Sequence, residues 1–162
     1  MLKVIFLLFC MLIINNTQAK NQFDVQGCEF IASFPGAPEI TNIFSQSDPD
    51  IPISRAEFFG QNYYLRAECF SLKNNQDSAL RKMLFDFGES QGLANLVLNS
   101  GSDQNGKWLL LRGNKKVGKE NTTYEIKNYI GERTFLSIYA GAYSNIYPTD
   151  EISNFLRGVT LK

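Results

Sequence analysis

Polar and apolar residues alternate along much of this chain, which is the pattern of β-strands that bury one face. In the segment 63–72, for example, Leu65, Ala67 and Cys69 share one parity. Turn-forming residues separate such segments, and Gly60-Gln61-Asn62 predicts a hairpin. The pattern predicts strands at 28–34, 55–59, 63–72, 93–98, 107–112, 122–130 and 134–140, a short strand or tail at 159–162, and turns at 100–106 and 113–121.

Two segments have helical spacing instead. In 77–91, apolar residues recur every three or four positions, and Gly92 is expected to end this helix. A second helix is expected after Thr149, a good N-cap residue. The expected buried residues are Leu80, Met83, Leu84 and Phe87 in the first helix and Ile152, Phe155 and Leu156 in the second. The chain is therefore predicted to form an α+β fold, an antiparallel β-sheet of about six or seven strands with two packed helices.

The N-terminal segment has the order of a secretory signal. Lys3 precedes an apolar run over residues 4–14, and Thr17 and Ala19 are small residues suited to a cleavage site. Eleven apolar residues at about 1.5 Å each reach only about 16 Å, which is too short for a membrane-spanning helix. We therefore expect a signal peptide at 1–19 and one globular domain at 20–162, exported to the periplasm or secreted, with no stable membrane span after cleavage.

Two cysteines remain after such a cleavage, Cys28 and Cys69. Each shares the parity of apolar neighbours, so both thiols are expected to face the core. An even number of cysteines in an exported chain favours a disulfide, and we predict one between these two residues, with their strands adjacent in the sheet. Two buried free thiols are the alternative.

Composition then excludes several function classes. The 162 residues contain no histidine, which removes Ser-His-Asp and Cys-His catalysis as well as histidine metal sites. Lysine plus arginine and aspartate plus glutamate number 16 each. This balanced charge supplies no basic field for nucleic acid, so no nucleic-acid partner is expected.

Three short motifs resemble catalytic or ligand-binding motifs but lack residues that those motifs require. Residues 88–92 match G-x-S-x-G, yet they lie at the end of a predicted helix and no histidine can take the serine proton. Residues 113–119 follow the P-loop pattern, but Glu120 replaces the hydroxyl residue that holds magnesium. Residues 103–106 resemble only a fragment of a calcium loop. We therefore expect no enzyme, no cofactor and no metal.

Aromatic and basic residues near the C-terminal half form the candidate partner surface. The loop 143–148 contains Tyr143 and Tyr147, and the predicted basic turn contains Lys115, Lys116 and Lys119. Such residues can contact a protein partner. The alternative is that the tyrosines cover the sheet and seal the edge of the core.

The order of elements resembles the PsbP-like α/β/α sandwich family. The resemblance rests on the opening CEFIASFPGAPE, with Phe34-Pro35-Gly36-x-Pro38, and on FLRGVTL near the C-terminus. It implies a mainly non-catalytic family that includes exported bacterial proteins. We therefore expect an exported, non-enzymatic binding or adaptor protein that acts through contacts with an unidentified protein partner. The alternative is a carrier of a small apolar ligand or lipid in the cell envelope.

Overall fold

The computed structural model describes residues 21–45, 50–72 and 77–162. The segment expected to be a signal peptide, 1–19, lies outside the described residues. Within the described part, neither helix combines the length and the apolar character that crossing a lipid bilayer requires.

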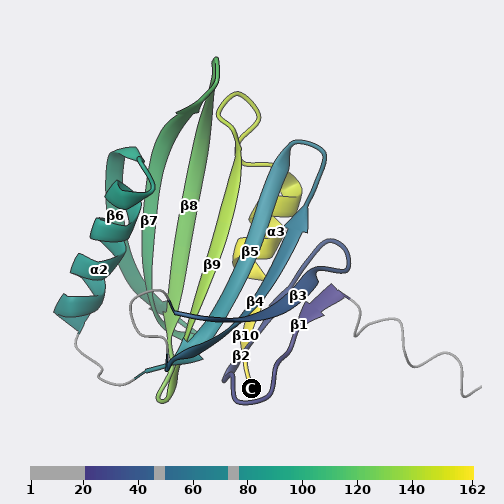
Figure 1. Ribbon diagram of the computed structural model, residues 1–162, viewed down its shortest axis with the longest axis vertical. Helices are drawn as coiled ribbons and strands as arrows, with labels where there is room; N and C mark the ends of the chain where they lie inside the picture. Colours follow the sequence, from purple (N-terminus) through teal and green to yellow (C-terminus); the bar gives the residue numbers. More distant parts are fainter. Residues whose placement is uncertain (1–20, 46–49, 73–76) are drawn as a thin grey trace, which may run out of the picture.

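A large antiparallel sheet forms the centre of the molecule (Figure 1). It has seven strands in the order β3-β4-β5-β9-β8-β7-β6, and every pairing is between antiparallel neighbours. The strands are β3 (Glu39–Phe44), β4 (Pro52–Phe59), β5 (Tyr63–Ser71), β6 (Ala94–Asp103), β7 (Gly106–Val117), β8 (Glu120–Ile130) and β9 (Thr134–Tyr143).

A second, smaller sheet and helix α3 (Asp150–Arg157) lie against one face of the large sheet. The small sheet has the order β1-β2-β10, with β1 (Gln22–Phe23), β2 (Phe30–Ser33) and β10 (Val159–Leu161). Thr149 caps α3 as predicted, because its Oγ1 accepts a hydrogen bond of 3.2 Å from the Ile152 backbone N–H. We call this covered side of the large sheet the α3 face.

Helix α2 (Asp77–Ser90) lies on the opposite side, which we call the α2 face. It packs on β6 and β7 near one edge of the sheet and leaves β3, β4 and β5 without a helix above them (Figure 1). Gly92 follows the helix with a positive φ of 72°, so it ends α2 as predicted.

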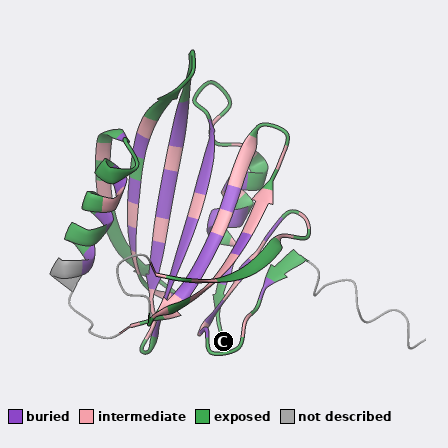
Figure 2. Ribbon diagram, in the orientation of Figure 1, coloured by how far each residue is buried: buried purple, intermediate pink, exposed green. Residues whose placement is uncertain are grey.

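Buried residues are concentrated in the central strands of the large sheet (Figure 2), and the apolar ones form two clusters, one on each face. One cluster joins the small sheet and α3 to the large sheet, and its fully enclosed members include Phe23, Phe30 and Ile152. The other joins α2 to β7, β8 and β9 and includes Leu84 and Leu111. The α+β class is therefore confirmed, with a seven-stranded and a three-stranded sheet and two helices in the described chain.

Two predicted turns are wrong. Residues 100–103 extend β6, and 113–117 with 120–121 extend the β7–β8 hairpin, so Lys115 and Lys116 belong to a strand. Most of these positions are polar and exposed, so the backbone ladder continues there without alternating apolar side chains to mark it. The actual turns are tight, and Gly106 and Gly118 supply positive φ values of 107° and 62°.

Three further predictions need correction. The polar lead-in before Cys28 contains a strand, β1, whose Phe23 is fully buried. Met83 is 45% exposed and does not face a core, because it lies at the side of α2 that no strand covers. The predicted adjacency of the two cysteine segments is also wrong, because Cys28 belongs to the segment between β1 and β2, whereas Cys69 lies in β5 of the large sheet.

Candidate functional site

A groove lies between α2 and the strands β3, β4 and β5 that the helix leaves uncovered. It has a volume of about 770 Å³ and is open to solvent. We call it the α2 groove. Its lining residues are Ile43, Phe44, Ser45, Ile53, Arg55, Arg66, Glu68, Phe70, Met83, Leu84, Phe87, Gln91, Asn128, Phe135, Ser137 and Tyr139.

Apolar side chains form the two walls of the α2 groove. On the sheet side, β3 and β4 contribute Ile43, Phe44 and Ile53, and Phe44 is 67% exposed. On the helix side, Met83 and Phe87 come from α2. These positions are four residues apart, so they lie on one side of the helix. Ile43 pairs in register with Ile53, and Ile53 with Phe70, so both isoleucines lie on the α2 face, whereas Phe44 borders the groove at the end of β3. Apolar residues thus line both walls.

The floor of the groove carries charged groups. Arg55 on β4 and Glu68 on β5 are register partners, and the Arg55 Nε donates a hydrogen bond of 2.6 Å to the Glu68 carboxylate. Arg66 points to the same face because it lies two residues before Glu68 on the same strand. Its Nε is 3.7 Å from Glu68 Oε1 and makes no hydrogen bond, although the guanidinium lies 3.9 Å above the ring of Tyr139.

A row of polar groups extends from this ion pair across four strands. Glu68 pairs in register with Ser137 on β9, and Ser137 pairs with Asn128 on β8. Ser137 Oγ donates a hydrogen bond of 2.6 Å to Asn128 Oδ1, and both residues are only 2% exposed. Buried polar groups in the middle of a sheet cost folding free energy unless they are paired. Their position in one row beneath an open groove makes them the most functionally suggestive polar set of the described residues.

Arg66 and Tyr139 of the floor both have raised pKa values. Burial lowers the pKa of Arg66, but Glu68 and Tyr139 outweigh this effect and leave the pKa raised. Burial, with Glu68 as the next cause, raises the pKa of Tyr139 to about 12. Arg66 is therefore a fixed cation and Tyr139 a neutral hydrogen-bonding phenol at physiological pH.

The residues of the predicted partner surface do not form one patch. Lys115, Thr122 and Tyr143 are register neighbours across β7, β8 and β9, so Lys115 and Tyr143 share the α2 face. The Lys115 ammonium donates a hydrogen bond of 2.8 Å to the Gln91 carbonyl at the end of α2. Lys116 alternates to the α3 face, and Lys119 lies at the tip of the β7–β8 hairpin.

Tyr147 packs against the core instead of lying fully exposed in its loop. Its hydroxyl donates a hydrogen bond of 2.8 Å to Glu125, and the Arg112 guanidinium lies 5.7 Å from its ring. Arg112 Nη2 is 2.6 Å from the same Glu125 carboxylate. The half-buried Tyr147 therefore closes the end of the α3 face, which is the role considered as the alternative to partner binding.

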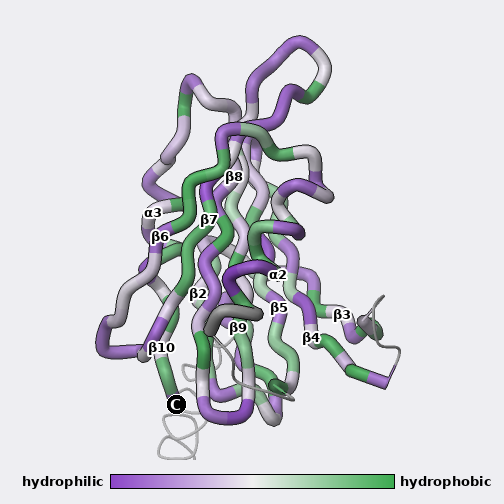
Figure 3. Tube along the Cα trace, turned by 90° about the vertical axis from the view of Figure 1, so that its left-hand side faces the viewer, coloured by the Kyte–Doolittle hydropathy of each residue, from purple (hydrophilic) through white to green (hydrophobic). Residues whose placement is uncertain are grey.

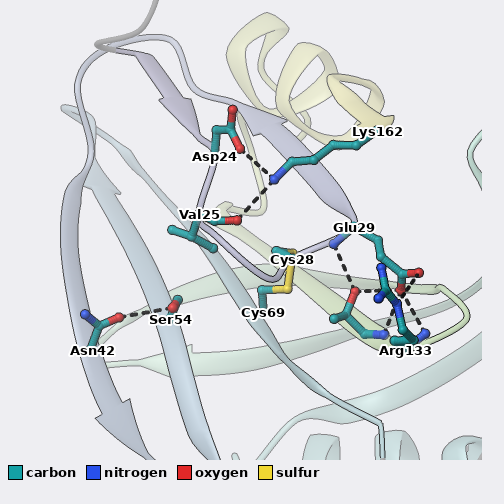
Figure 4. The surroundings of a disulfide bond; sticks show 10 residues. Asp24, Val25, Cys28, Glu29, Asn42, Ser54, Cys69, Arg133 and Lys162 are labelled. Atoms are coloured by element: carbon teal, nitrogen blue, oxygen red, sulfur yellow. Dashed lines mark hydrogen bonds and ion pairs between the residues drawn. A yellow bond between two sulfur atoms is a disulfide. The ribbon is translucent and has the colours of Figure 1, made fainter.

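The disulfide is present, and it connects the two sheets (Figure 4). Cys28 and Cys69 have Cα atoms 6.1 Å apart, and each residue is 5% exposed. Beside it, the Glu29 carboxylate accepts hydrogen bonds from the backbone N–H groups of Arg133 at 2.9 Å and Thr134 at 2.7 Å. Thr134 Oγ1 donates a third, at 2.9 Å. This cluster therefore ties the start of the small sheet to the turn between β8 and β9.

Glu29 is the carboxylate with a shifted pKa in a second cleft, of about 770 Å³, beside the disulfide. Burial raises its pKa, but the hydrogen bonds from Arg133 and Thr134 outweigh burial and lower it. A lowered pKa suits a permanently ionised anchor and does not suit a general acid. The geometry thus assigns Glu29 to structure.

The enzyme-like motifs take structural roles. Ser90 Oγ donates a hydrogen bond of 2.7 Å to the Phe87 carbonyl within α2. Gly88 is a close-packing position, since a Cβ there would lie 2.5 Å from Leu111 Cδ2. The P-loop-like residues form a β-hairpin with no following helix. Among the described residues, no group of three or more cysteine, aspartate or glutamate side chains is placed to hold a metal ion.

Sequence reasoning missed the α2 groove. The available signal was a set of polar residues at strand positions, such as Glu68, Asn128 and Ser137. Only the strand register shows that they lie side by side on the α2 face. The groove also depends on the lateral position of α2, which the helical periodicity does not specify.

Comparisons with known proteins give structural likenesses and no sequence match. No family model matches the chain, and no curated protein matches it. Among solved structures, the chain is similar to LpqN of Mycobacterium tuberculosis, described as involved in cell envelope biogenesis, with 16% sequence identity and a TM-score of 0.47. The match covers 79% of this chain and 86% of that one. The resemblance to the PsbP-like family stays a prediction.

Proposed function

We propose that this chain is an exported, non-enzymatic binding protein that holds a segment of a partner protein in the α2 groove. The observation that carries the proposal is the groove itself, an opening of about 770 Å³ with apolar walls and a polar floor. Apolar residues line opposite walls, Ile43 and Ile53 on the sheet side and Met83, which is 45% exposed, on the helix side. Apolar groups exposed together on a concave surface are typical of interaction sites.

The chemistry of the groove favours a polypeptide over a small apolar ligand. A peptide segment can place apolar side chains against Ile43, Met83 and Phe87 while its polar groups face Arg55 and Arg66. An acyl chain on the same floor would cover the charged groups without offering an acceptor to the unpaired Arg66 Nε. The preferred segment therefore combines apolar side chains with a carboxylate.

Export is supported by two features of the chain. The first is the charged, apolar and small-residue order of segment 1–19. The second is the disulfide between Cys28 and Cys69, because disulfides persist in oxidising compartments such as the periplasm or the extracellular space.

The non-enzymatic assignment rests on the roles of the reactive groups. The chain has no histidine, Ser90 is engaged within its own helix, and Glu29 is an ionised anchor. In the groove, Glu68 is held by Arg55.

The experiment is site-specific photocrosslinking in the producing cell. p-Benzoylphenylalanine replaces Phe44 at the groove, and a matched variant carries it in place of Tyr143, which is 43% exposed outside the groove. We expect one discrete protein adduct from position 44, mapped by mass spectrometry to a single segment of the partner. A synthetic peptide of that segment should then compete with the crosslink.

The outcomes separate the candidate functions. Equal crosslinking from positions 44 and 143 to the same partner would contradict the groove as the binding site. Native mass spectrometry of the exported protein tests the alternative carrier function. A bound lipid or other small molecule that is released on denaturation, and whose presence prevents crosslinking at position 44, would replace the proposal by a carrier function.

A further inference from the structure

Strand β6 forms an open edge of the large sheet, on the side that Figure 3 turns to the viewer. It pairs with β7 along one side, and within the described residues no strand pairs with its other side. The register is continuous from Val97 to Asp103 and is interrupted by a bulge between Ala94 and Val97. The outer side of this run therefore presents backbone donors and acceptors that a further strand can use.

The composition of β6 lacks the usual protection of an edge. Its sequence, ANLVLNSGSD, contains no lysine, arginine, glutamate or proline, and its single charge, Asp103, is at the end. Natural edge strands commonly avoid pairing with other chains through lysine or proline at the edge. Only the bulge at the start of β6 hinders pairing with another strand, and it leaves Val97–Asp103 open.

Apolar side chains flank the open run on both faces of the sheet. Val97 is 53% exposed, and its register partner Arg112 assigns it to the α3 face. On the α2 face, Leu98 is half-buried and Phe85 of α2 is 38% exposed. Arg81 of the same helix donates a hydrogen bond of 2.7 Å to Ser100 of β6, and Phe85 lies one turn further along on that side. Added strand pairing would thus also bury apolar surface.

The opposite edge, β3, is a weaker candidate. It has six residues against ten in β6 and begins with Glu39. Its neighbour β4 begins at Pro52. β3 therefore offers a shorter ladder with a charge at its start.

We propose that two copies of this chain associate through β6, in antiparallel register about a two-fold axis near Asn99 and Ser100. Self-pairing is favoured because the strand is close to neutral. With the axis at Asn99, Asp103 lies opposite Asn95 of the second copy; with the axis at Ser100, it lies opposite Val97. Neither arrangement opposes two like charges, which would destabilise the pair. The product is a continuous sheet of two seven-stranded halves, with the α2 grooves remote from the contact.

Sedimentation equilibrium over roughly a hundredfold range of protein concentration tests the proposal, because a dimer responds to mass action. Asn99→Lys introduces a charge at the centre of the pairing edge. The matched control is Thr41→Lys at the centre of β3, since both residues are exposed and lie on edge strands. We expect a concentration-dependent dimer whose association constant falls about tenfold or more in Asn99→Lys and changes less than about twofold in Thr41→Lys.

A second variant keeps the test decisive. In residues 20–162, where Cys28 and Cys69 are bridged, Asn99→Cys or Ser100→Cys adds one free thiol. The thiol that lies on the two-fold axis faces its copy within bridging distance, so mild oxidation should give a covalent dimer of one of these two variants, and Thr41→Cys should give none. A monomer at every concentration, or a dimer that Thr41→Lys weakens and Asn99→Lys does not, would overturn the proposal.

Discussion

The two faces of the large sheet are built on different principles. The α3 face is covered by the small sheet and α3, and its core residues Phe30, Leu136 and Ile152 have no exposed surface. The α2 face is covered only over part of its width, and its open part carries Arg55, Arg66 and Glu68 beneath apolar walls. The first arrangement maximises stability, whereas the second accepts buried charge and exposed apolar surface. Such costs are typical of sites where function constrains the sequence.

Removal of the disulfide is expected to give the largest change in stability, and it tests how the α3 face is held. Cys28 and Cys69 are separated by 41 residues and connect the small sheet to the large one. Cys28→Ala combined with Cys69→Ala should lower the free energy of unfolding by about 4 kcal/mol, because the unfolded chain regains the entropy of an open loop of that length. Urea unfolding of residues 20–162 measures this change. A loss under about 1 kcal/mol would show that packing alone holds the α3 face closed.

The packing of α2 on the sheet is expected to give the next largest change in stability. A Cβ at Gly88 would lie 2.5 Å from Cδ2 of Leu111, a fully buried residue, and 3.2 Å from Cδ2 of Leu96. Gly88→Val should therefore destabilise the fold by about 2 kcal/mol through overpacking. Glu89→Val places the same side chain at the next, exposed position and should cost less than about 0.5 kcal/mol. Equal urea midpoints for the two variants would mean that α2 shifts to accept the valine, and that the width of the groove is adjustable.

A smaller effect is expected at Glu29, and it depends on pH. Hydrogen bonds to its carboxylate lower the pKa below the ordinary value of 4.5, so the ionised form stabilises the folded state above that pH. Glu29→Gln should cost about 1 kcal/mol near neutral pH, and the difference from the unmodified protein should shrink as the pH falls through the lowered pKa of the folded state. Unfolding free energies measured from pH 7 to pH 3 test this.

The exposed neighbour Glu132 supplies the control for this titration. Glu132→Gln should leave the unfolding free energy unchanged at every pH, since that side chain is exposed at the β8–β9 turn. If both variants show the same pH profile, the effect belongs to the net charge of the turn and not to the hydrogen bonds that Glu29 accepts.

The α3 face was the more predictable of the two faces. The parity of Cys28, Phe30, Ala32 and Phe34 correctly marked one buried stripe, and Thr149 marked the start of α3. These signals are local, since strand alternation and helix capping are determined by neighbouring residues. The division into two sheets was missed, because alternation shows which side of a strand is buried and does not show which strand lies beside it.

The α2 face could not be predicted from the sequence, because strand alternation does not show which elements are neighbours. Arg66 and Glu68 have the spacing of an ordinary solvent-exposed side of a strand, and their burial depends on residues of α2 and of the neighbouring strands that line the same groove. The predicted stripe on α2 was partly wrong because Met83 lines the groove instead of a core. Arg66, Glu68 and Met83, which depart from the simple amphipathic pattern, thus all line the candidate site.

The smallest expected effect on stability is also the sharpest test of the comparison. Met83 is 45% exposed at the groove wall, so Met83→Ser should change the unfolding free energy by less than about 0.5 kcal/mol. It should nevertheless reduce the crosslink from position 44 about tenfold, because the partner segment loses an apolar contact at the wall. Phe85→Ser is the matched control, since Phe85 is 38% exposed on the β6 side of the same helix. That variant should leave the crosslink unchanged and weaken self-association through β6; the reverse pattern would place the partner at the sheet edge and not in the groove.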